Sequence, residues 1–295
     1  MINQNTDSVD SNQNPDHISY SELVDWNICP HFHKLKWIDK LKKFEQNIFS
    51  IFGTALHNAA ERLVLEEYIS RTKNQIFSYK RKETEELFQK QFQEEINKWL
   101  GDREPSEEEK ELILRMYSKQ GPALLPNILD ALRSTFSFDY ELHNTEELLM
   151  EPIPEDPDGK KFKGYVDLIL KDSSGIFHII DWKTCSWGWD AKEKSSKMKT
   201  YQLTLYKNFF SQKSDIPLEQ IKCHFALLKR TAREKSNIEI FEVPVGKIKI
   251  KNALELLEEA NFNIKAKHHP KNLLGCRKHF GKCPFEGTEH CKKGW

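Results

Sequence analysis

The chain has 295 residues, of which 38% are hydrophobic and 31% are charged, a composition typical of a folded protein with much solvated helical surface. Lysine plus arginine number 45, as do aspartate plus glutamate, so net charge gives no support for a nucleic-acid partner and only the distribution of charge can. No stretch approaches the ~18 consecutive apolar residues of a membrane helix. The N-terminus lacks the basic and apolar regions of a secretory signal. We therefore expect a cytoplasmic protein with no membrane partner, in which disulfides are rare.

Residues 1–17 are rich in Asn, Asp, Ser and Gln, which predicts a disordered tail. The rest of the chain, residues 18–295, is interpreted as one domain. Residues 71–145 contain a helical pattern rich in Glu, Lys and Gln, which we interpret as an insertion of two or three helices. Gly121-Pro122 is expected to break this pattern. Residues 271–295 form a cysteine-rich C-terminal segment.

Two helices are predicted before the insertion. Ser19 followed by Glu22 is typical of a capping box at a helix start, and Pro30 is expected to end that helix. Residues 52–70 carry apolar side chains at helical spacing, which predicts a second helix. His57 lies on the flank of its apolar stripe. A lone histidine there is more often structural than a metal ligand.

The pattern changes to strands after Thr145. Asp156-Pro157-Asp158-Gly159 and Asp172-Ser173-Ser174-Gly175 are turn signals, so the strands they join are expected to form antiparallel hairpins. The chain is therefore predicted to be an α/β protein with a mixed β-sheet flanked by helices. The predicted strands cover residues 146–153, 162–170, 176–182, 221–228 and 238–243, and the predicted helices cover residues 197–211 and 246–267.

Two carboxylates and a lysine are predicted to converge on this sheet. Asp167 lies near the middle of the second predicted strand, and Asp181 and Lys183 end the third. Because strand side chains alternate, Asp181 and Lys183 share a face. Such carboxylates suit Mg²⁺ or Mn²⁺, and the ammonium could orient water or offset charge on a phosphate. The alternative is a structural salt bridge at a strand end.

Four ordered motifs resemble those of RecB-like nucleases of the PD-(D/E)xK superfamily. They are Gly53-Thr54-Ala55-Leu56-His57, Gly164-Tyr165-Val166-Asp167, Asp181-Trp182-Lys183-Thr184 and Gln202-Leu203-Thr204-Leu205-Tyr206. The resemblance covers roughly residues 19–230 but not the insertion. It implies a restriction-endonuclease-like fold and a metal-dependent DNA nuclease, specifically an exonuclease. The implied substrate is DNA with single-stranded character, in repair, recombination, or phage- or CRISPR-type processing, with proteins of those systems or of replication as partners. The alternative is a catalytically inactive nucleic-acid-binding module of the same fold.

The resemblance also implies residue roles. His57, Asp167, Asp181 and the carbonyl of Trp182 would bind the metal, and Lys183 would be the catalytic lysine. Glu151 would act beside the catalytic residues and help to position the metal or the lysine. The residues expected to support the active site or contact DNA are Tyr201, Gln202, Tyr206, Lys192, Lys194, Lys197 and Lys199.

Six cysteines remain to be explained. Cys29 near the N-terminus, with Cys276, Cys283 and Cys291 near the C-terminus, resembles the iron–sulfur branch of these nucleases, which includes the AddB nuclease and CRISPR-associated exonucleases. The resemblance implies that the four thiolates hold a [4Fe–4S] cluster. A structural Zn²⁺ site that uses His279 or His290 is the alternative, and so is no metal at all. Cys185 and Cys223 are expected to have no ligand role.

Overall fold

The computed structural model describes residues 16–41, 46–75, 81–277 and 282–292, so most of the predicted tail lies outside the described residues. The chain divides into two compact units. The smaller comprises Met1–Lys43, Met150–Lys163 and Leu256–Trp295, and the larger comprises Phe44–Leu149 and Gly164–Glu255. None of the described helices is long and apolar enough to cross a membrane.

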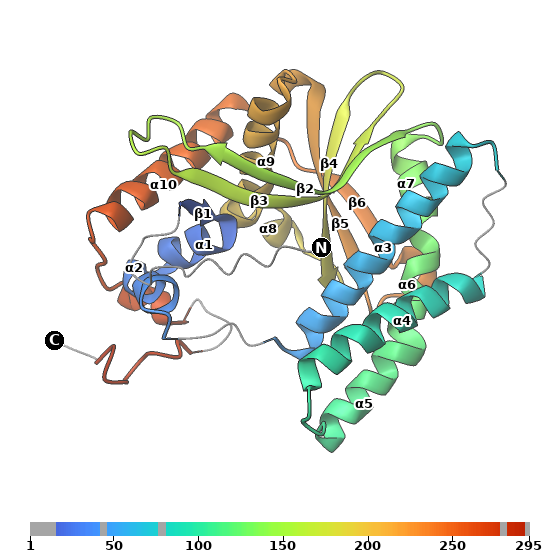
Figure 1. Ribbon diagram of the computed structural model, residues 1–295, viewed down its shortest axis with the longest axis horizontal. Coiled ribbons are helices and arrows are strands. Elements are labelled where there is room, and N and C mark those ends of the chain that lie inside the picture. Colours follow the sequence, from blue (N-terminus) through green and yellow to red (C-terminus); the bar gives the residue numbers. More distant parts are fainter. Residues whose placement is uncertain (1–15, 42–45, 76–80, 278–281, 293–295) are drawn as a thin grey trace, which may run out of the picture. The chain divides into compact units, whose positions relative to one another are not determined.

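Six strands form a mixed sheet, which confirms the predicted fold class (Figure 1). The order is β1-β3-β4-β5-β6, and β2 also pairs with β3. β1 is parallel to β3 and β4 to β5, whereas β3–β4 and β5–β6 are antiparallel. The strands are β1 (His17–Ser19), β2 (Glu141–Pro152), β3 (Lys161–Lys171), β4 (Phe177–Cys185), β5 (Ile221–Lys229) and β6 (Ile238–Glu242).

The predicted hairpin between β3 and β4 is present. Asp172 Oδ1 accepts hydrogen bonds from the backbone N–H groups of Ser174 and Ile176, each at 2.9 Å, and Gly175 has a φ of 87°, which favours glycine. This turn sets a register in which Leu168 lies opposite Ile180. The next residues along the two strands are Asp167 and Asp181.

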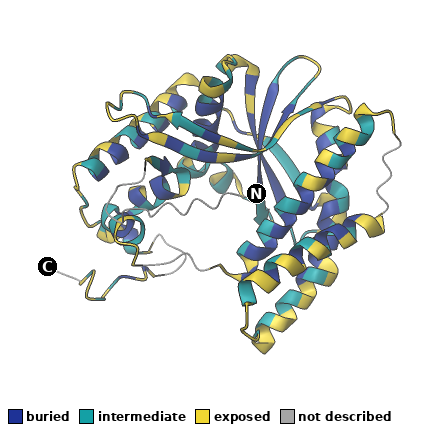
Figure 2. Cartoon of the chain, viewed as in Figure 1, coloured by how far each residue is buried: buried dark blue, intermediate teal, exposed yellow. Residues whose placement is uncertain are grey.

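The helices of the larger unit pack against the sheet. Their buried apolar side chains form one core with Leu168, Ile180 and Trp182. Strands β4 and β5 are mostly buried (Figure 2), whereas α5 has no buried residue. The predicted insertion is therefore part of the core around the sheet. Its helices, with the one before it, are α3 (Ile48–Thr72), α4 (Arg81–Leu100), α5 (Glu107–Arg115), α6 (Gly121–Leu124) and α7 (Ile128–Phe136).

The predicted break at Gly121-Pro122 is wrong. A π-helical turn, Met116–Gln120, runs directly into α6, and the 3-10 turn Leu125–Asn127 continues into α7. A Cβ atom at Gly121 would lie 2.0 Å from the ring of Phe88. The glycine therefore permits close packing against α4, and Pro122 lies just after the π-helical turn, as the second residue of α6.

The prediction for the first helix is correct in position but not in the full capping box. α1 (Tyr20–Ile28) begins after Ser19, whose hydroxyl accepts the Glu22 N–H at 3.2 Å. The Glu22 carboxylate instead lies 2.8 Å from Nε2 of buried His33. Pro30 ends α1 but also begins α2 (Pro30–His33). The remaining helices are α8 (Ala191–Lys194), α9 (Lys197–Ser214) and α10 (Lys247–Lys265).

Candidate active site

Alternation along β4 separates the side chains of the DxK motif. Asp181 is 2% exposed, and Trp182, on the opposite face of the strand, is buried in the core of the larger unit. Lys183 returns to the face of Asp181, and its side chain is 32% exposed. β4 continues to Cys185, so the aspartate and lysine lie within the strand rather than ending it, which corrects the predicted boundary.

The predicted residues His57, Asp167, Asp181 and Lys183 come together in pairs. Lys183 Nζ lies 2.6 Å from Asp181 Oδ2. Asp167 Oδ2 accepts the Trp182 backbone N–H at 2.6 Å and lies 4.0 Å from His57 Nδ1. The other ring nitrogen of His57, Nε2, is buried and has no hydrogen-bond partner among the described residues. It is thus available to a ligand.

The electrostatics of this cluster favour a cation. Burial, followed by the charge of Asp181, holds the pKa of Asp167 well above its usual range, although Lys183 acts in the opposite direction. Burial also raises the pKa of Asp181, against the opposing effect of Lys183. Loss of water around the ring, with a smaller contribution from Lys183, lowers the pKa of His57 to about 3. The imidazole is therefore neutral near pH 7, the form that binds metal ions.

Two further carboxylates belong to the same surroundings, and the sequence analysis did not identify them. Glu146 is exposed as a residue, but partial loss of water around its carboxyl group and then the charges of Glu61 and Asp181 raise its pKa. Glu61 accepts a hydrogen bond from the Thr145 hydroxyl at 2.6 Å. The position of Glu61, four residues after His57 on α3, was the available signal, because such residues share a helix face.

Helix α9 packs on β4 and β5 and carries the predicted supporting residues. Gln202 Nε2 donates to Tyr206 Oη at 3.0 Å, so the two residues four positions apart do share a face. Tyr201 is 2% exposed and Tyr206 is 5% exposed. Both tyrosines therefore also contribute to packing.

The four predicted DNA-contacting lysines fall into two classes. Lys194 pairs with Glu239 and Lys199 with Glu193, so local carboxylates offset their charges. Lys192 and Lys197 are exposed and have no ion pair within the described residues. Glu151 lies on the part of β2 that belongs to the smaller unit, and its role remains a prediction.

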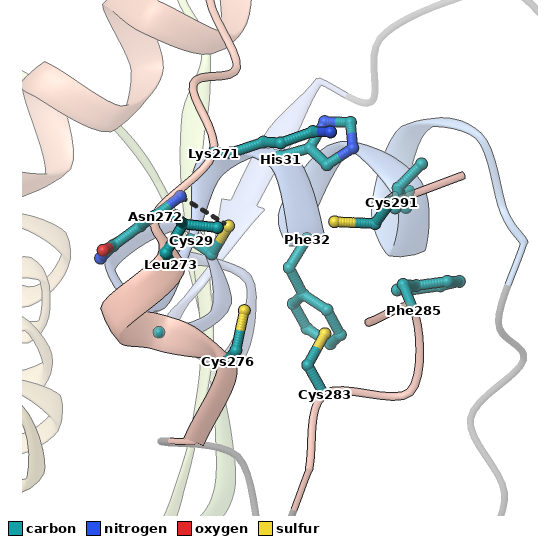
Figure 3. A pocket seen from close by; sticks show the side chains of 12 residues that line it. Cys29, His31, Phe32, Lys271, Asn272, Leu273, Cys276, Cys283, Phe285 and Cys291 are labelled. Carbon is teal, nitrogen blue, oxygen red and sulfur yellow. Dashed lines mark hydrogen bonds between the residues drawn. The ribbon is translucent and has the colours of Figure 1, made fainter. Parts of the chain in front are cut away.

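In the smaller unit, the four cysteines of the predicted cluster line one pocket (Figure 3). Their sulfur atoms face a common space, and none of the four forms a disulfide within the described residues. Cys29 and Cys283 are each 8% exposed, and Cys276 and Cys291 are partly buried. Phe32 and Phe285 also line this pocket, with ring centroids 5.7 Å apart.

Backbone contacts bring the distant cysteines together. The Asn272 N–H donates to Cys29 Sγ at 3.3 Å, and its side-chain amide donates to the Ile28 carbonyl at 2.9 Å. A Cβ atom at Gly275 would lie 2.4 Å from that carbonyl oxygen. The glycine therefore allows the 3-10 turn Leu273–Arg277 to approach the end of α1.

The other sulfur and histidine predictions have different outcomes. Cys223 is 1% exposed, and its thiol donates to the Leu203 carbonyl at 3.5 Å, as expected for a core residue. Cys185 lies at the end of β4. The side chain of His290 is 40% exposed and lies 3.5 Å from Glu289, and it does not line the cysteine pocket. His279 lies outside the described residues.

The side chains near Asp181 have the donor atoms that a divalent metal ion needs, and the four cysteines have those that an iron–sulfur cluster needs. Neither set of described residues is arranged in a coordination geometry. In the described part of the chain, no group of three or more His, Cys, Asp or Glu side chains is arranged to hold a metal ion. Burial and the charge of Asp181 nevertheless raise the pKa of Asp167, and the His57 Nε2 atom has no hydrogen-bond partner within the described residues. Four cysteines around one pocket are likewise the ligand set of an iron–sulfur cluster or zinc.

Comparisons with known proteins agree with this architecture. The chain matches the PD-(D/E)XK nuclease superfamily over residues 17–293. A solved structure described as a "Putative exonuclease" from Eubacterium rectale is 12% identical, with a TM-score of 0.51 over 95% of this chain and 94% of that chain. The structure of SSO0001 is 21% identical, with a TM-score of 0.31 over 52% of this chain and 66% of that chain. No curated protein matches the sequence. Because the family match spans nearly the whole chain, this protein belongs to the PD-(D/E)XK nuclease superfamily.

Proposed function

We propose that the chain is a Mg²⁺- or Mn²⁺-dependent deoxyribonuclease that removes nucleotides from the ends of DNA with single-stranded character. The observation that carries this proposal is that buried Asp181 lies with Asp167 and Lys183 on adjacent strands, with His57 beside Asp167. DNA repair, recombination, and phage- or CRISPR-type processing are the proposed settings. Proteins of those systems, or of replication, are the proposed partners.

The carboxylates and the imidazole would hold the divalent ion. Asp167, Asp181 and Nε2 of His57 supply the donors, and the Trp182 carbonyl is a further candidate because its own N–H already contacts Asp167. Glu146 is a further candidate carboxylate beside the predicted Glu151, since burial and the charges of Glu61 and Asp181 raise its pKa. When bound, the ion polarises a phosphate oxygen and makes water a better nucleophile.

Lys183 would act on the charge that develops during cleavage. Its ammonium lies 2.6 Å from Asp181 while its side chain remains 32% exposed, so it has both a position and access to a substrate. From there it can orient the attacking water or donate to a phosphate oxygen. The Gln202–Tyr206 pair on α9 supplies polar groups that can hold the lysine or a phosphate in place.

Cleavage of end-labelled single- and double-stranded DNA tests the proposal. Wild-type protein should shorten single strands from one end with Mg²⁺ or Mn²⁺ and do nothing in EDTA. Asp181→Asn keeps the shape of the side chain but removes its charge, and should be inactive with either metal. A closed circular single strand should resist cleavage, because it has no end.

Three outcomes would change the conclusion. Robust cleavage in EDTA would exclude the metal-dependent mechanism. Cleavage of the circular strand would make the protein an endonuclease. Binding of DNA without cleavage under every metal condition would favour the inactive nucleic-acid-binding module.

We also propose that Cys29, Cys276, Cys283 and Cys291 hold a [4Fe–4S] cluster in the smaller unit. The support is that these four cysteines line one pocket although Cys29 is far from the others in sequence. A cluster there would tie the C-terminal segment to α2, a connection that the few apolar groups of this segment stabilise only weakly.

Anaerobic purification tests this assignment. Wild-type protein should be brown, and serine in place of any one of the four cysteines should remove the colour and lower the melting temperature. Cys185→Ser and Cys223→Ala serve as controls and should remain brown. Colourless protein with one tightly held zinc would replace the cluster with a zinc site. Colourless, metal-free protein after anaerobic reconstitution would refute both.

A further inference from the structure

An exposed tryptophan follows the active-site strand. Trp187 lies two residues beyond the end of β4 and is 75% exposed. Trp187 is four positions after Lys183 in the chain, so their Cα atoms are at most about 14 Å apart. A single exposed apolar side chain is ordinary. Trp187 differs from such a residue in two respects: its loop is anchored on both sides, and an arginine and a second exposed aromatic ring lie nearby.

The loop that carries Trp187 is anchored on both sides of the indole. Before it, Ser186 accepts two side-chain hydrogen bonds, from Arg230 Nη2 to its hydroxyl at 2.7 Å and from the Thr231 hydroxyl to its carbonyl at 2.6 Å. After it, Trp189 packs against Phe225, with ring centroids 5.0 Å apart. Trp187 is therefore held in water by a braced backbone, and binding a partner would not require the loop to become ordered.

Gly188 also contributes to the conformation of this loop. Its φ of 115° is a conformation that favours glycine, and a Cβ atom there would lie 3.0 Å from Cδ of Lys229. The backbone that carries the indole thus lies close to the end of β5. In this loop Trp189 is partly buried, whereas Trp187 is exposed.

An arginine and a second exposed aromatic ring lie beside this loop. The guanidinium of Arg230 lies 4.7 Å from the ring centroid of Phe49, which is 47% exposed in the first turn of α3. On the same helix, a Cβ atom at Gly53 would contact Thr184 at 3.7 Å, so the start of α3 and the end of β4 are in contact. Phe49 and His57 lie two turns apart on this helix.

We propose that Trp187, Phe49 and Arg230 form a stacking surface for unpaired bases of the substrate strand next to the cleaved phosphate. This inference rests on the proposed function, since it places the bases beside the phosphate that Asp181 and Lys183 would act on. Flat aromatic rings interleaved with arginine are the elements by which proteins bind single strands without reading their sequence. In a duplex the base faces cover one another, so the surface selects strands that are already unpaired.

The charge of the surroundings favours a nucleic acid over an apolar protein partner. Arg230 contacts both the ring of Phe49 and Ser186, the residue before Trp187, and the exposed Lys192 follows the loop. An apolar protein surface would leave the guanidinium without an anionic partner, whereas a phosphodiester strand supplies bases for the rings and phosphates for the cations. A protein partner is thus the alternative that the experiment must separate.

Binding of fluorescent single-stranded oligothymidylate, measured by anisotropy with EDTA and again with Ca²⁺, tests the stacking surface. Trp187→Ala should weaken binding about 5- to 150-fold, the range found when one base loses its aromatic partner. Trp187→Phe should retain most of the affinity. Phe138→Ala is the matched control, because Phe138 is similarly exposed at 62% but lies beside Arg133, which pairs with Glu67, ten residues beyond His57 on α3.

A substrate that lacks bases separates stacking from general damage to the loop. Wild-type protein should bind an abasic strand of equal length more weakly than oligothymidylate, and the difference between the two strands should be smaller for Trp187→Ala. Wild-type affinity in Trp187→Ala, or an equal loss for both strands, would overturn the proposal. So would a wild-type protein that does not bind oligothymidylate.

The inference and the proposed function can fail separately. Stacking-dependent binding without cleavage under any metal condition would leave the surface in place and refute the nuclease proposal. Normal cleavage with wild-type affinity in Trp187→Ala would leave the nuclease in place and refute the surface.

Discussion

Replacing His57 with glutamine should change how the stability of the protein depends on pH. Burial, with a smaller effect of Lys183, lowers the pKa of His57 from 6.5 to about 3. Below about pH 6.5, His57 is therefore protonated in the unfolded chain but stays neutral in the folded protein until the pH approaches 3. The contribution of this group to stability is complete above pH 6.5 and is lost progressively as the pH falls towards 3.

The size of the effect follows from this difference. Each pKa unit corresponds to about 1.4 kcal/mol, so lowering the pH from 7 to 5 should cost the wild-type protein about 2 kcal/mol through His57 alone. For a chain of this size, that loss corresponds to a fall of roughly 4 to 8 °C in melting temperature. The side chain is 26% exposed, which makes this figure an upper value.

Thermal unfolding in EDTA at pH 7 and pH 5 measures the effect. His57→Gln should lose about 2 kcal/mol less between these pH values than the wild type, because other titrating groups are common to both proteins and cancel. His290→Gln replaces a histidine whose side chain is 40% exposed and should follow the wild type. Equal pH dependence in His57→Gln and wild-type protein would show that the imidazole is not held neutral by its surroundings.

Three further substitutions test other parts of the structure. Lys183→Ala should slow cleavage roughly 10²- to 10³-fold. Mg²⁺ should raise the melting temperature of this variant more than that of the wild type, because the Asp181 carboxylate has lost its cation. Cleavage at the wild-type rate would exclude a catalytic role for Lys183. Alanine at both Lys192 and Lys197 should lower the slope of log affinity against log salt by about one for each lost phosphate contact, and an unchanged slope would make them ordinary surface residues. Gly121→Ala should destabilise the protein by about 1 to 3 kcal/mol through the clash with Phe88, whereas a higher melting temperature would contradict the close packing of α6 on α4.

Local patterns in the sequence were enough to predict most elements and the two acidic strands. Alternation along residues 176–182 separated the Asp181 side chain from the buried Trp182 ring, because successive strand residues face opposite sides. The turn signal at Asp172 and Gly175 predicted the hairpin that brings Asp167 beside β4. These features depend on residues that are close together in the sequence, and they can therefore be predicted without knowledge of the tertiary structure.

The same local reasoning was wrong where a tertiary contact outweighed it. Gly121 was expected to break a helix, but its missing side chain is what lets α6 approach Phe88. Glu22 was expected to cap its own helix, but buried His33 provides a partner in a less polar setting. The preference of glycine against a helix interior is only about 1 kcal/mol, and one buried contact can exceed it.

Other features exist only in three dimensions. The resemblance to iron–sulfur nucleases, not the spacing alone, grouped Cys29 with the C-terminal cysteines, and the fold supplies the contact at Gly275 that brings them to one pocket. Glu146 joins the acidic cluster because β2 and α3 meet near Thr145. The exposure of Trp187 follows from hydrogen bonds to a turn more than 40 residues later. The sequence by itself determined which groups the chain can offer and the faces of its helices and strands, whereas tertiary packing decided which of those groups share a site, because proximity between distant residues depends on the whole core.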